Sequence, residues 1–112
     1  MALTFELAAF TVREGQDASL VAERPQMISA LGQAFPGLLG AWLTKRDDGS
    51  WVDVILWQSR EEAEHAAAHV NGVPAAKAWF RHIAESHGLQ HLEVTHEELF
   101  GFAVRDSVKP RT

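Results

Sequence analysis

The chain is 112 residues long, a length that fits a single domain with one hydrophobic core. Its 15 acidic and 10 basic residues give a net charge of −5, and the basic residues are scattered, which argues against nucleic acid or an anionic membrane as a partner. The absence of cysteine excludes disulfides, thiolate nucleophiles and zinc–thiolate sites. Because the sequence shows neither a secretory leader nor a long apolar run, we expect a soluble, cytoplasmic protein.

The first predicted element is a strand over residues 3–12. Odd-numbered apolar residues alternate there with Thr4, Glu6 and an alanine, which is the pattern of a strand with two different faces. Phe10 and Val12 make the end of the second face apolar as well. This end of the strand is therefore expected to be more fully covered than its start.

A helix is predicted next, with Asp17 as the candidate N-cap and a course towards Ala34. Its apolar residues recur at helical spacings and predict one buried stripe. Pro25 either kinks this helix or opens a second helix after a short first one. Pro36 and Gly37 end the helical region. The predicted stripe consists of Leu20, Met27, Ile28, Leu31 and Phe35.

A β-hairpin follows the helix. One strand is predicted over residues 39–45 and another over residues 51–57, and Asp47-Asp48-Gly49 between them has the acid–glycine pattern of a tight turn. The second strand is apolar on both faces, so both of its faces need cover. Asp53 is the single acid in it, on the face that carries two tryptophans. The two faces are Val52, Val54 and Leu56 on one side and Trp51, Ile55 and Trp57 on the other.

Two further helical segments and a last strand complete the prediction. Ser59 is a candidate N-cap with Glu62 at the spacing of a capping box. Pro74 opens the next helical segment, which His87-Gly88 is expected to end. The last strand is predicted from His91 to Leu99. The two predicted buried stripes are Ala63, Ala66, Ala67 and Val70, and then Ala76, Trp79, Phe80 and Ile83.

The predicted order of elements, β-α-β-β-α-β, is that of a ferredoxin-like α+β domain with both helical regions on one face of a four-stranded antiparallel sheet. We assign this domain to residues 1–105 and a C-terminal tail to residues 106–112. The other face of the sheet would carry large apolar groups with no cover from the same chain. We therefore expect a homodimer in which two sheets pack face to face.

These features together resemble the dimeric α/β-barrel superfamily, and within it the small proteins grouped with antibiotic-biosynthesis monooxygenases. The resemblance spans about residues 3–100 and implies a sheet-to-sheet dimer with a pocket in each subunit between sheet and helices. It does not by itself imply a reaction, because the superfamily includes oxygenases, haem-degrading enzymes and stress proteins. It is carried by Pro36-Gly37, Asp47-Asp48-Gly49, the strand from Asp53 to Trp57 with its continuation Gln58-Ser59-Arg60-Glu61-Glu62-Ala63, and Pro74 with Trp79.

Asp53 and His82 are the candidate catalytic residues. An ionised carboxylate inside an apolar strand must be paired, hydrogen-bonded or neutralised, so Asp53 is either a base with a raised pKa in a pocket or a structural acid bonded to an Arg, a His or Thr44. His82 borders the predicted stripe at Ile83 and is either a general base, a haem ligand or a half-exposed surface residue.

Trp57, Trp79 and Phe80 are the candidate substrate-binding residues, because two indole walls with an N–H donor each suit a flat ligand; the alternative is plain core packing. His65 and His69 have metal-ligand spacing, but the helical wheel turns them towards solvent, so we predict no metal site.

Three functions remain open at this point. The first is a cofactor-independent monooxygenase for a small aromatic or quinol-like substrate. In such an enzyme a base removes a proton from the substrate, and the resulting carbanion reacts directly with O₂. The second is a non-catalytic dimeric module that binds an apolar ligand or serves in assembly. The third, haem binding, is disfavoured by the resemblance, because haem-degrading relatives use an Asn on the first strand, whereas the only asparagine of this chain is Asn71. No cofactor is therefore expected, and the expected partners are a second copy and a small apolar or aromatic ligand.

Overall fold

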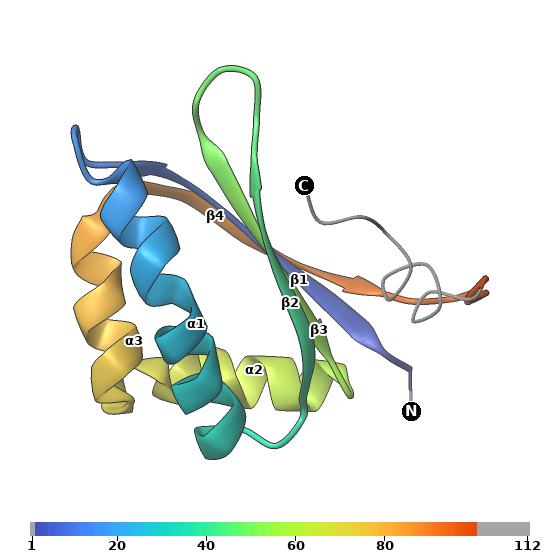
Figure 1. The fold of residues 1–112 in the computed structure, drawn as a ribbon. Helices are drawn as coiled ribbons and strands as arrows, with labels where there is room; N and C mark the ends of the chain where they lie inside the picture. Colours follow the sequence, from blue (N-terminus) through green and yellow to red (C-terminus); the bar gives the residue numbers. More distant parts are fainter. Residues whose placement is uncertain (1, 101–112) are drawn as a thin grey trace.

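The computed structural model describes residues 2–100, which form a four-stranded antiparallel sheet with helices on one face (Figure 1). The strands lie in the order β2-β3-β1-β4, so the predicted ferredoxin-like α+β fold is confirmed. The predicted domain end at residue 105 and the tail lie outside the described residues. Along the chain the elements are β1 (Thr4–Val12), α1 (Asp17–Ala34), β2 (Leu38–Lys45), β3 (Trp51–Trp57), α2 (Arg60–His69), the 3₁₀ turn η1 (Val70–Gly72), α3 (Pro74–Trp79), the 3₁₀ turn η2 (Phe80–His82) and β4 (Ile83–Glu93).

The tryptophan face of β3 lies beneath the helices. Trp51, Asp53, Ile55 and Trp57 are all buried, whereas the alternate residues of this strand are only partly covered. On β1, Thr4, Glu6, Ala8 and Phe10 pair with these four residues and share the helix side of the sheet. The alternation in the sequence predicted two apolar faces without saying which one the helices cover, and the packing now assigns them.

The opposite side of the sheet has no helix over it in the described part of the chain (Figure 1). Trp42 and Leu92 are 42% and 46% exposed there, and the Trp42 ring lies 6.5 Å from that of Phe5. We call this surface the open sheet face. It consists of Phe5, Leu7, Trp42, Val52, Val54, Leu56 and Leu92.

Helix α1 is one continuous helix with Pro25 inside it, which decides between the two predicted alternatives. The prediction that Asp17 caps it was wrong. Gln16 occupies the N-cap position without a side-chain cap, and Asp17 is the first helical residue, where its carboxylate pairs with Lys45 at 3.1 Å. A negative charge in the first turn is still favourable there, because it faces the positive end of the helix dipole.

Helix α2 begins as predicted, since the Ser59 hydroxyl accepts a hydrogen bond of 3.2 Å from the Glu62 backbone N–H. Ala63 and Ala66 are buried, which lets this helix approach the sheet closely. The prediction that Ala67 also packs in the core was wrong, because Ala67 is exposed at the rim of the cavity described below.

The prediction that the helical segment opened by Pro74 continues to His87-Gly88 was also wrong. Helix α3 ends at Trp79, and after η2 the chain enters β4 at Ile83 rather than at His91. Because β4 is an edge strand with mostly exposed side chains, its sequence lacks the apolar alternation that identifies a covered strand. Gly88, with φ of +123°, lies inside this strand beside a register shift and does not end a helix. None of the helices described is long and apolar enough to cross a membrane.

Candidate functional site

A cavity of about 420 Å³ lies between the sheet and the helices, within the size range of small-molecule sites. Most of its wall is apolar, and two carboxylates, those of Glu6 and Asp53, interrupt it. Strands β1 and β3 contribute Ala8, Phe10, Ile55 and Trp57 to the wall. The helical segments contribute Met27, Leu31, Ala66, Ala67, Trp79 and Phe80. The edge strand β4 contributes Ile83, Ser86, Gly88 and Leu89 near the rim.

Asp53 is paired with Arg24 of α1. The two guanidinium nitrogens Nη1 and Nη2 donate to Asp53 Oδ2 and Oδ1 at 2.7 and 2.6 Å, and both side chains are about nine-tenths buried. Burial raises the pKa of Asp53, and the hydrogen bonds and charge of Arg24 oppose that rise. Since Arg24 engages both oxygens, this arrangement has the geometry of the structural acid that we weighed against a base.

Glu6 is the second largely buried carboxylate and lies in the first half of β1. Its Oε1 is 3.1 Å from Nε2 of His91 on β4, and the two side chains are 12% and 11% exposed. Burial raises the pKa of Glu6, the nearby Asp53 charge adds to the rise, and His91 opposes it. Unlike Asp53, Glu6 has no arginine partner among the described contacts, so its carboxylate is the better candidate to accept a proton.

Trp57 lines the cavity with its indole ring, and the indole nitrogen is buried. Its side chain is 2% exposed, and its indole nitrogen has no hydrogen-bond partner in the described structure. The indole approaches the Glu6 carboxylate closely enough to favour its ionised form, but the contact lacks hydrogen-bond geometry. A buried N–H without a partner is costly, and this one lies beside the Glu6 carboxylate, behind the ring that lines the cavity.

Trp79 and Phe80 form the wall opposite the sheet. Trp79 packs edge-to-face against Phe10 at 6.1 Å between ring centroids, and its indole N–H donates to the Leu20 carbonyl at 2.8 Å. Trp79 therefore offers an apolar surface and no free donor. The structure brings the three candidate binding residues, Trp57, Trp79 and Phe80, to one cavity.

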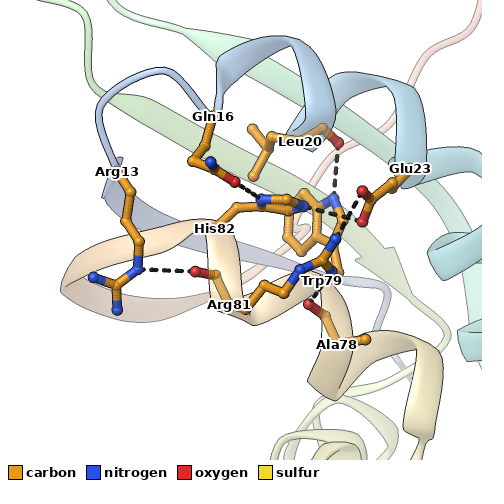
Figure 2. A network of polar contacts seen from close by, with 8 residues as sticks. All are labelled: Arg13, Gln16, Leu20, Glu23, Ala78, Trp79, Arg81 and His82. Atoms are coloured by element: carbon orange, nitrogen blue, oxygen red, sulfur yellow. Dashed lines mark hydrogen bonds and ion pairs between the residues drawn. The ribbon is translucent and has the colours of Figure 1, made fainter.

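His82 lies outside this cavity. Figure 2 shows its ring between the start of α1 and η2, where Nδ1 is 2.7 Å from Gln16 Oε1 and Nε2 is 3.0 Å from Glu23 Oε1. Arg81 also pairs with Glu23, and Arg13 donates to the Arg81 carbonyl. With its ring 1% exposed and both nitrogens engaged, His82 joins two helical segments and has no free nitrogen for iron or for a substrate.

His65 and His69 stack on the exposed side of α2 with ring centroids 4.4 Å apart, and the His69 ring also contacts the His65 carbonyl. No group of three or more metal-ligating side chains occurs between residues 2 and 100.

Two residues of the site escaped the sequence analysis. Glu6 was assigned to the more polar face of its strand, although it shares parity with Phe10, which marks that face as covered. Arg24 was left out of the α1 stripe, although it is four residues after Leu20 and three before Met27. In both cases the spacing along the chain indicated a buried position, but a charged side chain is usually assigned to the surface.

Comparison with known proteins finds solved structures of the same fold but no matching sequence family. No family model matches the chain, and no curated protein matches it. Among solved structures, a candidate antibiotic biosynthesis monooxygenase from Bordetella bronchiseptica is similar, with a TM-score of 0.64 and 16% identity over 89% of this chain and all of that one. A candidate antibiotic biosynthesis monooxygenase from Caulobacter crescentus CB15 reaches 0.65, with 17% identity over 85% of this chain and 92% of that one.

The cofactor-independent oxygenase SnoaB from Streptomyces nogalater has the same fold, with a TM-score of 0.61 and 19% identity over 88% of this chain and 97% of that one. These likenesses confirm the predicted resemblance in fold. At such low identities the reaction must be argued from the residues of the cavity.

Proposed function

We propose that the protein is a cofactor-independent monooxygenase for a small phenol, quinol or enolisable aromatic ketone. The observation that carries this proposal is the buried Glu6 carboxylate, with its raised pKa, in the wall of an apolar cavity of about 420 Å³. A carboxylate whose pKa is moved towards neutrality is a more effective proton acceptor than an exposed one.

In the proposed reaction a substrate with a reactive CH₂ group, as in an anthrone, lies against Trp57 and Trp79. Glu6 removes the proton, and the charge that develops is delocalised onto the substrate oxygen. The carbanion then reacts with O₂, and the peroxide that forms takes the proton back from Glu6. The hydroperoxide loses water, together with the second hydrogen of the CH₂ group, to leave a carbonyl group. One oxygen atom enters the product and the other leaves as water, so no external reductant is required.

Oxygen uptake with anthrone-type and hydroquinone substrates tests this function, and a substitution at the cavity rim ties any uptake to the cavity. Ala67→Trp places a large ring over the rim, whereas Ala68→Trp adds the same ring at an exposed neighbour that does not line the cavity. We expect the first variant to lose about a hundredfold in kcat/KM because the substrate is displaced or excluded, and the second to behave like wild type. Equal activity in both variants, or no uptake across the panel by wild type, would reject the proposal.

A non-catalytic ligand-binding role is the second candidate. It is favoured by the Asp53–Arg24 pair, which removes one of the two carboxylates of the cavity from proton transfer. Binding of the same aromatic compounds without oxygen consumption would support this alternative.

We further propose that two copies pack through the open sheet face. The support is the row of partly exposed apolar side chains, including Trp42 and Leu92, that crosses all four strands of the sheet.

Val54→Lys, at the middle of the open sheet face, is expected to weaken self-association by on the order of a hundredfold or more, since it buries a charge in an apolar contact. Sedimentation equilibrium measures the change. Val21→Lys adds the same charge at an exposed position of α1 and should leave the dimer intact. A wild-type monomer at micromolar concentration would refute the dimer, as would a Val54→Lys dimer of unchanged stability.

A further inference from the structure

The titratable side chains that line the cavity are both acidic and carry negative charge when ionised. Glu6 and Asp53 are among the lining residues, and the described lining contains no lysine, arginine or histidine. The nearest buried cation, Arg24, directs both terminal nitrogens at Asp53. His91 is 3.1 Å from Glu6 Oε1 and is not part of the lining, so its contact is with the Glu6 carboxylate and not with a ligand in the cavity.

A ligand anion would therefore be poorly accommodated. Moving a carboxylate out of water is costly unless hydrogen bonds and an opposite charge compensate it. Beside its apolar side chains, the described lining offers the neutral hydroxyl of Ser86 and the repulsion of the Glu6 carboxylate. A neutral hydroxyl is sufficient for a carbonyl or hydroxyl oxygen, whose desolvation cost is much smaller.

We infer that the cavity selects uncharged, oxygen-bearing aromatic ligands and excludes their carboxylated counterparts, with Glu6 as the residue that sets this selectivity. The inference rests on the proposed function only in taking the cavity as the substrate site. It concerns binding, so it holds or fails separately from oxygen chemistry.

Two anthraquinones of almost equal shape provide the test. 2-(Hydroxymethyl)anthraquinone is neutral and anthraquinone-2-carboxylate is an anion at about pH 8, and both are already oxidised, so neither is turned over. Quenching of tryptophan fluorescence reports binding because Trp57 and Trp79 line the cavity, and equilibrium dialysis checks the constants. We expect wild type to bind the neutral compound at least about tenfold more tightly, as a like charge a few ångströms away requires.

Glu6→Gln keeps the size of the side chain and removes its charge, so it should reduce this ratio several-fold, mainly by improving binding of the carboxylate. Glu61→Gln makes the same change of charge on the exposed side of α2 and should leave the ratio unaltered. Equal binding of both compounds by wild type would overturn the inference, as would a ratio that Glu6→Gln does not change or the absence of binding by either compound. Selective binding without any oxygen uptake would preserve this inference and reject the monooxygenase.

Discussion

Glu6→Gln is expected to reduce oxygen-dependent turnover by about 10²- to 10⁴-fold, the usual contribution of a positioned general base. Glutamine has nearly the same shape and can still accept a hydrogen bond from His91 through its amide oxygen, so the cavity should keep its form. Only the capacity to take up a proton is lost. Initial rates of oxygen consumption at saturating and at low substrate concentration measure the change.

If Glu6 is the base, the pH dependence of the wild-type activity should show the same requirement for an ionised Glu6. Glu6 must be ionised to accept a proton, so kcat/KM is expected to fall as pH falls through the pKa of Glu6, which burial places above its ordinary value of 4.5. This acid limb should be missing from the residual activity of Glu6→Gln. Full activity in Glu6→Gln would reject Glu6 as the base and return Asp53 to that role, which Asp53→Asn would then test.

Stability provides the control for this variant. Because the folded protein holds the Glu6 proton more tightly than the unfolded chain does, ionised Glu6 reduces stability as the pH rises through and above the ordinary carboxyl range. Replacing it with a neutral amide should therefore leave the free energy of unfolding at about pH 7 unchanged or higher. A loss of activity in a protein of full stability assigns the effect to chemistry.

Arg24→Met is expected to cost about 3–5 kcal/mol of unfolding free energy at neutral pH, because it leaves the Asp53 carboxylate buried without its partner. The guanidinium also lies 5.7 Å from the ring centroid of Trp79, so part of the cost is lost packing against a cavity wall. Urea unfolding monitored by tryptophan fluorescence measures the change. The pair Arg24→Met with Asp53→Leu should recover much of the loss, since an apolar pair of similar volume replaces two buried charges.

An exposed ion pair provides the comparison. Arg60 and Glu64 are four apart on α2 with both side chains more than half exposed, so Arg60→Met should cost less than about 0.5 kcal/mol. Acid should partly restore Arg24→Met relative to wild type, because an unpaired Asp53 with a further raised pKa takes up a proton in the folded state as the pH falls. Equal losses of unfolding free energy in Arg24→Met and Arg60→Met would show that the buried Arg24–Asp53 pair contributes no more to stability than an exposed ion pair.

The sequence predicts the fold well wherever side chains are covered on a defined face. The two-faced β3, the Ser59 cap and the acid–glycine turn are local patterns with one structural solution, and each lies where it was expected. The start of β4 was missed because an exposed edge strand is held by backbone hydrogen bonds to β1, and such bonds leave no pattern in the side chains.

The site was harder to predict than the fold. The aromatic wall follows from periodicity, so Trp57, Trp79 and Phe80 could be identified from sequence. The partners of the two carboxylates could not, since Arg24 and Asp53 are 29 residues apart and Glu6 and His91 are 85 apart. Which charged residue meets which depends on the crossing of α1 over the sheet and on the register of β4, and neither is encoded locally.

The sheet has a consequence for how ligand binding and assembly relate to each other. The rim of the cavity, with exposed Ala67 and Leu89, belongs to the helix side, while the proposed contact between copies uses the other side of the same four strands. The cavity lining and the open sheet face have no residue in common. Occupancy of the two cavities in a dimer would then be statistically independent, with no Hill coefficient above one and no change in the dimer dissociation constant as the ligand saturates.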